Sequence, residues 1–535
     1  TNMFLWQPIP AAFYSPCVDG DYDMSVIAHE YGHMISNRMV GGPDQRLLGL
    51  QANAMGESWS DLAAVELLIS SGDIPADQAN PFAVGAYVTG DDVAGIRNYG
   101  MNRSPLNYSD VGYDFACTTN AAGECVILGQ VHADGEIWSA VNADIRSAMI
   151  ARYGAGTQAQ QDACIAGEVP STACPGNRRW IQLVFDAWLL MLGPTSMLDA
   201  RDAMLAADLT RFGGANQDLL WNAFARRGFG QGASTTGTDD VDPIPDFTSP
   251  YADEATVTFR PVGDGTGTAA ELFVGHYEAR VTPIADTDPA TPLDDTFRII
   301  PGAYDFLTGA RGFGITRTTM SFRAGQVRDM PVYLRRNLAS SANGATVSGD
   351  GVNHEMLIDD TEATNWAFLG VDPAAENEAI GTEVTVRLDP SAPAHELRRI
   401  QVSAQLRPRI HTDPADPGSQ SRFSALRQFE IWVCTASATV DCTQDSQFRR
   451  IFTSPADAFP SVAPRPRAPD LTTRSFAVPR TTASHVRIRV LHNQCTGGPD
   501  FQGEQDQDPR YLTDCGEGST QDDIVRIAEL QVFSR

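Results

Sequence analysis

The strongest constraint on the fold is a pair of histidines in the segment 23–68. His29 and His33 are four residues apart, and Glu30 follows the first of them. Residues at positions i and i+4 lie one above the other on the same face of an α-helix. A helix that begins after Asp23, a residue suited to cap it, therefore places both imidazoles within reach of one metal ion. Glu30 then projects beside them.

Two acidic residues downstream complete the expected site. Glu57 and Asp61 lie one helical turn apart in the segment GESWSD, after a Gly-Gly-Pro break at 41–43. We expect this break to let a second helix fold back, so that Glu57 becomes the third ligand of a zinc ion with one open position. Asp61 would accept the second ring N–H of a ligating histidine. Glu30 would then be the general base that takes a proton from the attacking water.

The segments around these residues resemble one known family. HEYGHMISNRMVGG and MGESWSD are similar to the fungalysins, secreted metallopeptidases whose catalytic half is related to thermolysin. Four further segments resemble the same family, up to about residue 230: GIRNYGMNRSPLNYSDV, VHADGEIWSAV, SMLDARDAMLAAD and LLWNAFARRGFG. The resemblance implies a secreted, extracellular zinc metalloendopeptidase of the gluzincin type. It also implies that His132 stabilises the oxyanion and that Arg97 holds the substrate carbonyl.

Several alternatives compete with this interpretation. A surface- or glycan-binding adhesin could carry an inactive peptidase domain, but an intact Glu30 argues against a lost activity. A zinc aminopeptidase could use a similar glutamate, yet it needs a site for a free substrate amine, and the sequence shows no such motif. His132 could be a helix N-terminal histidine without a task, and Arg97 a solvated surface residue.

Charge and hydropathy exclude several classes of partner. The chain has 39 basic against 67 acidic residues, a formal net charge of −28, and its basic residues are all arginines. Such acidity disfavours nucleic acids and anionic membranes as partners. No apolar run approaches the length of a membrane span. We therefore expect protein or peptide substrates, no nucleic acid and no membrane span.

Composition and periodicity predict a multidomain α + β protein. Residues 1–230 read as a mostly helical, thermolysin-like zinc-peptidase region, and the Gly-, Ser-, Thr-, Asp- and Pro-rich stretch 231–250 reads as a linker. Apolar and polar residues then alternate in 251–338, which predicts a small β-sandwich similar to carboxypeptidase-regulatory or transthyretin-like modules. Residues 339–535 form a third unit.

This third unit resembles the discoidin, or coagulation-factor C-type, family of galactose-binding-like jelly rolls. The resemblance lies in Asp360, Thr364 and Trp366, and in a closing strand over 525–532. It implies a carbohydrate or cell-surface ligand for 339–535, so that the C-terminal modules would anchor the enzyme. We interpret Trp366 as a core aromatic rather than a ligand contact. A structural Ca²⁺ is a further expectation for the chain.

The cysteines indicate an oxidising compartment. Eight of the nine form short-range couples around polar loops, and none has the Cys-x-x-Cys spacing of zinc ribbons. Cys17 is left over. The couples predict these disulfides: Cys117–Cys125, Cys164–Cys174, Cys434–Cys442 and Cys495–Cys515.

The start of the chain lies close to the expected site. Thr1 is only 28 residues before His29, with no initiator Met and no signal peptide ahead of it. A peptidase of this type needs an N-terminal lobe as the other wall of its cleft. We therefore expect a fragment that lacks its signal, propeptide and first lobe.

Overall fold

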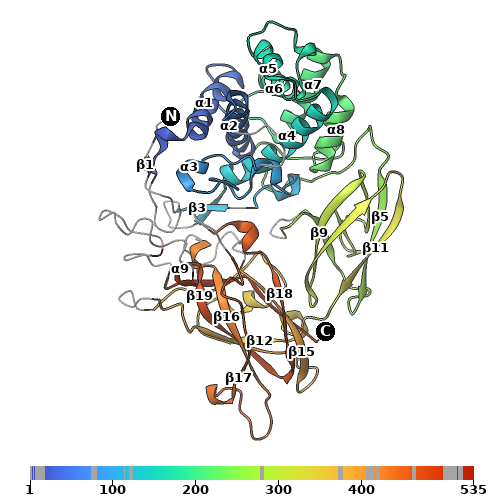
Figure 1. The fold of residues 1–535 in the computed structure, drawn as a ribbon. Helices are drawn as coiled ribbons and strands as arrows, with labels where there is room; N and C mark the ends of the chain where they lie inside the picture. The colour runs from blue at the N-terminus through green and yellow to red at the C-terminus, as the bar shows by residue number, and fades with distance from the viewer. Residues whose placement is uncertain are drawn as a thin grey trace.

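The computed structural model contains a helical N-terminal region, a small β-sandwich and a larger β-domain (Figure 1). This confirms the predicted α + β multidomain fold. The structure describes residues 3, 5–6, 18–73, 81–113, 115–119, 125–277, 282–371, 377–404, 415–416, 422–460, 466–497, 515 and 522–534. Within these residues, no helix is long and apolar enough to cross a membrane.

The N-terminal region is built from helices that pack on one another. Asp23 caps the first of them, as predicted, because its carboxylate accepts hydrogen bonds from the backbone N–H groups of Ser25 and Val26. The helices are α1 (Met24–Met39), α2 (Leu50–Ser71), α3 (Ala86–Thr89), α4 (Val131–Tyr153), α5 (Gln158–Ile165), α6 (Gly176–Trp188), α7 (Met197–Phe212) and α8 (Gln217–Arg226). Short strands accompany them: β1 (Leu5–Trp6), β2 (Val18–Asp19), β3 (Phe115–Thr119) and β4 (Cys125–Gly129).

The beginning of α2 is set by a distant segment. Periodicity places the start near Asn53, but the helix begins at Leu50, because Asp239 accepts a hydrogen bond from the Leu50 N–H at 3.0 Å. Thr238 accepts another from the Ala52 N–H. Residues 231–250, predicted as a linker, thus supply caps to a helix of the N-terminal region.

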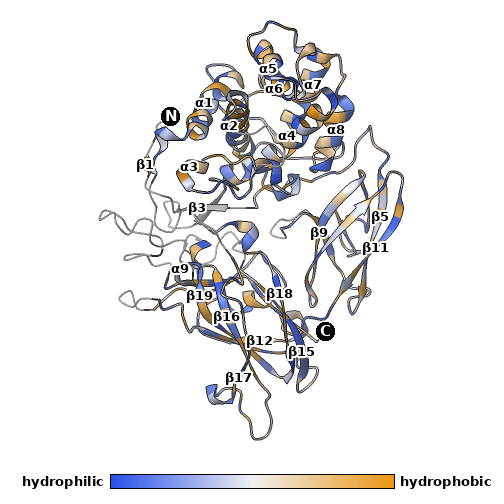
Figure 2. Cartoon of the chain, in the orientation of Figure 1, coloured by the Kyte–Doolittle hydropathy of each residue, from blue (hydrophilic) through white to orange (hydrophobic). Residues whose placement is uncertain are grey.

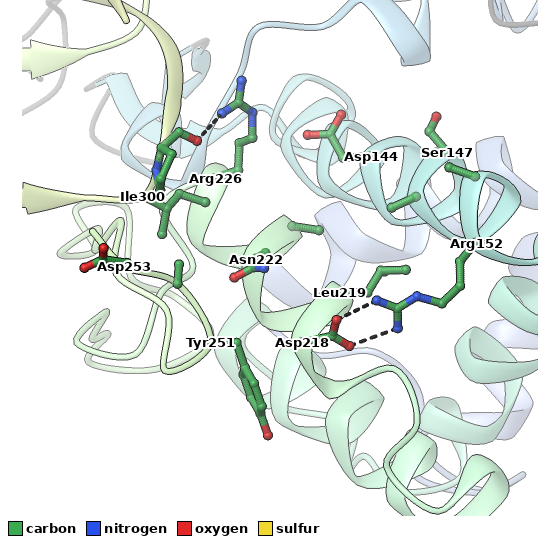
Figure 3. Close-up of a pocket in the computed structure, with 15 residues that line it drawn as sticks. Asp144, Ser147, Arg152, Asp218, Leu219, Asn222, Arg226, Tyr251, Asp253 and Ile300 are labelled. Atoms are coloured by element: carbon green, nitrogen blue, oxygen red, sulfur yellow. Dashed lines mark hydrogen bonds and ion pairs between the residues drawn. The ribbon is translucent and has the colours of Figure 1, made fainter. Parts of the chain in front are cut away.

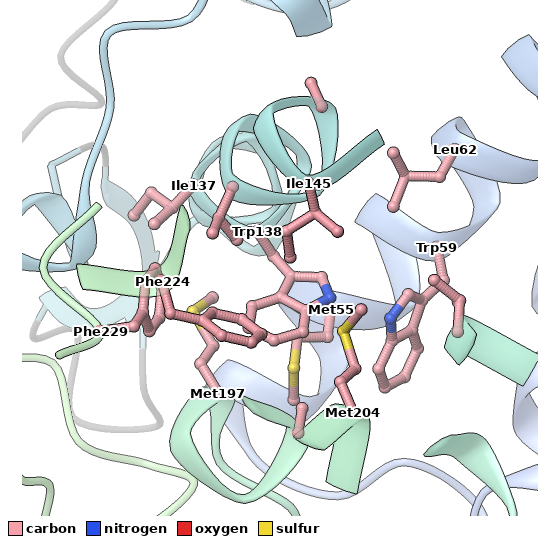
Figure 4. Close-up of a cluster of buried hydrophobic side chains, with 14 of the residues drawn as sticks. Met55, Trp59, Leu62, Ile137, Trp138, Ile145, Met197, Met204, Phe224 and Phe229 are labelled. Carbon is pink, nitrogen blue, oxygen red and sulfur yellow. The ribbon is translucent and has the colours of Figure 1, made fainter. Parts of the chain in front are cut away.

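Large aromatic side chains fill the core of the helical region (Figure 4). Trp138 of α4 is fully buried and packs against Phe224 of α8 and Phe229. Trp59 of α2 meets Trp188 of α6 edge-on at 5.6 Å between ring centroids. These rings remove large apolar areas from water and so hold α2, α4, α6 and α8 in fixed relative positions.

The small β-sandwich consists of two facing sheets. One has the strand order β10-β9-β6-β7 and the other β11-β5-β8, with β11 parallel to β5. Apolar residues alternate with polar ones along the strands (Figure 2), and Phe259, Phe306 and Phe322 lie in the core. The strands are β5 (Ala255–Gly263), β6 (Glu271–Val274), β7 (Ala285–Asp286), β8 (Thr296–Ile299), β9 (Gly302–Ala310), β10 (Gly314–Phe322) and β11 (Val327–Leu334).

The C-terminal domain pairs a sheet of order β12-β14-β19-β16-β17 with a sheet of order β18-β15-β21, and β13 pairs with β20. Trp366 is fully buried and donates to the Asp350 carbonyl at 2.9 Å, which makes it a core aromatic as predicted. The elements are β12 (Thr346–Gly349), β13 (Trp366–Phe368), β14 (Glu383–Arg387), β15 (His395–Ser403), β16 (Leu426–Cys434), β17 (Arg449–Thr453), β18 (Arg474–Ala483), β19 (His485–Asn493), α9 (Gln494–Gly497), β20 (Val525–Ile527) and β21 (Glu529–Phe533).

Three of the predicted disulfides are present. They staple short loops in the helical region and in the C-terminal domain: Cys164–Cys174, Cys434–Cys442 and Cys495–Cys515. The predicted Cys117–Cys125 bridge and the leftover Cys17 lie outside the side chains that the structure describes.

The domains also contact one another by polar groups. Arg422, at the edge of the C-terminal domain, donates to the Asn98 side chain of the helical region at 2.8 Å. Tyr277 of the small sandwich shares a hydrogen bond with Tyr99. The segment that follows α3 therefore touches both β-domains.

Candidate metal centre

The centre lies where α1 crosses α2. Gly32 of α1 faces Ser60 of α2 so closely that a Cβ on Gly32 would be only 2.8 Å from the Ser60 Cα. This glycine follows His29 by three residues, and Ser60 follows Glu57 by three. Close approach of the two backbones at this point brings the imidazoles of one helix to the carboxylate of the other.

Three donor atoms converge at the crossing. The Nε2 atoms of His29 and His33 lie 3.4 Å from Glu57 Oε2 and 3.4 Å from Glu57 Oε1, respectively. The ligand atoms of the three side chains all lie within 4.8 Å of one another. Zinc bonds of about 2.0–2.1 Å in a tetrahedron separate neighbouring ligands by about 3.4 Å. The donor set and its spacing therefore fit a zinc ion.

Asp61 orients the first histidine. Its Oδ1 lies 2.8 Å from His29 Nδ1, so a carboxylate that only accepts fixes the proton on Nδ1 and leaves Nε2 to bind a metal. Asp61 also accepts two hydrogen bonds from Arg97, from Nε to Oδ2 at 2.8 Å and from Nη2 to Oδ1 at 2.9 Å. Asp61 is thus held on both sides.

The electrostatics of the crossing favour a cation. Burial alone would lower the pKa of His29, but its hydrogen bonds to Asp61 and Glu57 raise that pKa to about 9. Burial would likewise raise the pKa of Glu57, but His29, His33 and the nearby Arg97 hold that pKa far below its usual range. Both carboxylates are therefore charged, and a proton on His29 stands where a metal ion would compete for the nitrogen.

Arg97 is buried, with 6% of its surface exposed, which excludes a solvated surface arginine. Besides Asp61 it contacts Glu57, with Nη2 3.3 Å from Oε2. In this structure the guanidinium contacts these two carboxylates. Its contact with a substrate carbonyl stays a prediction.

His132 reaches the centre from a third helix. It lies in the first turn of α4, with Nε2 3.5 Å from Glu57 Oε2 and a side chain that is 55% exposed. Its Nδ1 contacts the Gln130 side chain at 2.7 Å, which orients the ring. Helix α4 comes this close because Gly135 packs on α2, where a Cβ would be 3.1 Å from Glu57 Cβ.

Glu30 lies on α1 directly after His29 and is partly exposed. The structure thus places every predicted site residue on α1, α2, the start of α4 or the segment after α3. Within the described residues, His29, His33 and Glu57 are the only group of three or more such side chains that could hold a metal ion. The expectation of a structural Ca²⁺ is therefore not supported.

One structural residue of the site had escaped sequence reasoning. Glu136, four residues after His132 on α4, accepts the backbone N–H groups of Asn98 and Tyr99, each at 3.0 Å. It is buried and fixes the segment that carries Arg97. A carboxylate on the buried face of a helix was the available signal, but nothing local shows which backbone it binds.

Solved structures offer distant likenesses. CpGH89CBM32-5 from Clostridium perfringens, in complex with GalNAc-beta-1,3-galactose, is 17% identical with a TM-score of 0.21, and the match covers 37% of this chain and 99% of that chain. Chitosan-binding module 2 from a chitosanase/glucanase of Paenibacillus sp. IK-5 is 12% identical with a TM-score of 0.20, and covers 37% and 99%.

Sequence comparisons point to a peptidase family. An extracellular metalloproteinase MEP of Leptosphaeria maculans is 32% identical over 251 residues, which are 45% of this chain and 35% of that protein. Extracellular metalloproteinase MEP of Pyricularia oryzae is 33% identical over 238 residues, 43% and 33% of the two chains. The chain thus spans about a third of the length of the curated relatives it matches. The resemblance seen in the sequence is confirmed: residues 1–233 match the fungalysin metallopeptidase (M36) family.

Proposed function

We propose that this chain carries the zinc-binding half of a secreted, extracellular endopeptidase, with His29, His33 and Glu57 as the protein ligands. The observation that carries the proposal is the 3.4 Å spacing of each histidine from Glu57 at the α1–α2 crossing. Similarity to proteins named extracellular metalloproteinases supports the reaction class and the location. When bound, zinc polarises the scissile carbonyl and lowers the pKa of water towards about 7.

The side chains around the ligands supply the other steps. Glu30 accepts a proton from the attacking water and returns it to the leaving amine. His132, whose ring is exposed beside Glu57, donates a hydrogen bond to the oxyanion that develops on the carbonyl. Arg97 and Asp61 hold His29 and Glu57 in place, and Arg97 adds positive charge on the same side.

The β-rich C-terminal modules would anchor the enzyme to a matrix or cell surface. The discoidin-like features of residues 339–535 support this role. The loop disulfides Cys434–Cys442 and Cys495–Cys515 suit an oxidising location outside the cell.

Two variants of the full chain test the catalytic proposal. Glu57→Ala should lose most of the bound zinc, whereas Glu30→Gln should keep the zinc and lose turnover. Zinc is measured by elemental analysis, and turnover with N-acetylated quenched-fluorescence peptides, which an aminopeptidase does not cleave. Turnover of Glu30→Gln near the wild-type rate would contradict the mechanism. No hydrolysis by the zinc-loaded wild type would favour the adhesin alternative.

A further inference from the structure

Two clefts between domains differ in how their arginines are compensated. The first, of about 1020 Å³, lies between α4, α8 and the start of the small sandwich (Figure 3). There Arg152 donates to both carboxylate oxygens of Asp218, and Arg226 donates to the Pro301 carbonyl. The positive charge of Arg152 is thus already paired within the chain, and this cleft calls for no ligand.

The second cleft, of about 460 Å³, lies between the small sandwich and the C-terminal domain. Its walls are fixed to each other, because the Gly312 N–H donates to Asp360 at 2.6 Å and the Ile315 N–H donates to Gln531 at 3.3 Å. Strand β15 forms one wall. Arg399 and Gln401 are two residues apart on it, so both point to the cleft face.

Three arginines line this second cleft, but only one is compensated. Arg317 forms an ion pair with Glu362. Arg335 and Arg399 form no ion pair with any residue that the structure describes, and no lining residue is acidic. Arg399 lies over the Phe533 ring, 4.3 Å from its centroid, and its Nε is buried without a hydrogen-bond partner among the described residues.

Two unpaired guanidiniums in one cleft are costly in a chain of net charge −28. Burial lowers the pKa of Arg399, and the neighbouring Arg335 lowers it further. A half-buried charge without a partner loses hydration and gains nothing in return. A bound anion would restore the balance, because guanidinium groups bind carboxylates and sulfates through paired N–H donors.

We propose that this cleft binds the anionic group of an acidic oligosaccharide, either a uronate carboxylate or a sulfate ester. Arg335 and Arg399 would hold the anion. Thr316 and Gln401 also line the cleft and match the hydroxyl groups of a sugar. Tyr333, which is 65% exposed, offers a ring face for the apolar side of a sugar ring.

The volume supports a small ligand. A cleft of about 460 Å³ lies within the range of about 300–1,000 Å³ that is typical of ligand pockets. The site is built by the small sandwich together with the sheet β18-β15-β21, far in sequence from the zinc ligands. The proposal therefore does not rest on peptidase activity, and its failure would leave the proposed catalytic function untouched.

The test is binding of four matched probes to the full chain by isothermal titration calorimetry. The probes are tetragalacturonate, a sulfated galactose tetrasaccharide, neutral galactotetraose and a tetraglutamate peptide. We expect at least one acidic sugar to bind about tenfold or more tightly than the neutral sugar and the peptide, and to weaken with added salt. Which acidic sugar binds identifies the anion.

Two variants assign the binding to the cleft. Arg335→Gln/Arg399→Gln should weaken the acidic sugar by about tenfold or more. Arg398→Gln is the matched control, since Arg398 neighbours Arg399 on β15 but pairs with Glu396 at 2.7 Å and does not line the cleft. It should bind like the wild type.

Stability gives an independent readout. Removing two unpaired charges should leave the melting temperature of the double variant unchanged or higher, whereas a marked decrease would show that the arginines are already paired and would overturn the proposal. Equal affinity of the acidic and neutral sugars, unchanged binding by the double variant, or preference for tetraglutamate would overturn it as well. If the double variant does not fold, Arg399→Gln alone provides the same comparison.

Discussion

Gly32→Ala should damage the metal centre more than it damages the fold. The new Cβ would lie 2.8 Å from the Ser60 Cα, 3.1 Å from its Oγ and 3.2 Å from its Cβ. Carbon atoms pack at about 3.5–4.0 Å, so α1 and α2 must separate by roughly 1 Å at this point. The obstacle includes backbone, which cannot rotate away.

The expected magnitudes follow from this displacement. Overpacking costs about 1–3 kcal/mol, and replacing a helix glycine by alanine returns about 1 kcal/mol, so unfolding free energy should fall by roughly 0–2 kcal/mol. A shift of roughly 1 Å is half of a zinc–ligand bond of about 2.0–2.1 Å and exceeds the tolerance of about 0.5 Å for a preorganised site. Zinc affinity should therefore fall by about tenfold or more, which corresponds to at least about 1.4 kcal/mol.

The assay is competition for zinc between the apo-protein and a chromophoric chelator, alongside chemical unfolding of the apo-protein. Gly56→Ala is the matched control, because it lies next to Glu57 and gains the same helix propensity. Its Cβ would meet only the end of the flexible Leu47 side chain at 2.7 Å. Wild-type zinc affinity in Gly32→Ala would refute the reasoning that the tight crossing sets the ligand geometry.

Three further predictions follow. Asp61→Ala should weaken zinc binding by about 10–100-fold in the same chelator assay, because His29 loses the carboxylate that orients it; unchanged affinity would remove Asp61 from this role. Arg422→Ala should lower the unfolding free energy by about 1.5–3 kcal/mol in denaturant titrations, since it removes a charged hydrogen bond to Asn98, while Arg480→Ala, which removes an exposed pair, should change little. Non-reducing peptide mapping should find Cys117–Cys125 beside the three bridges of the structure, and a bridge between domains would contradict the local pairing.

Much of the metal centre was predictable because its information is local. The four-residue spacing of His29 and His33 places them on one helix face whatever surrounds the helix. The fold-back of Glu57 followed from a glycine-rich break between two amphipathic segments. Period-two alternation likewise predicted the β-domains, since side chains on a strand point alternately to either face.

The sequence by itself therefore determined the metal ligands, the orienting Asp61 and the class of each domain. Only the tertiary structure decided that Gly32 packs against Ser60, that Glu136 holds the segment of Arg97, and that Arg335 faces Arg399 across a cleft. The contact of Arg422 with Asn98 joins residues 324 positions apart. Periodicity depends on backbone geometry within a few residues, whereas such partners depend on the path of the whole chain, which no local pattern encodes.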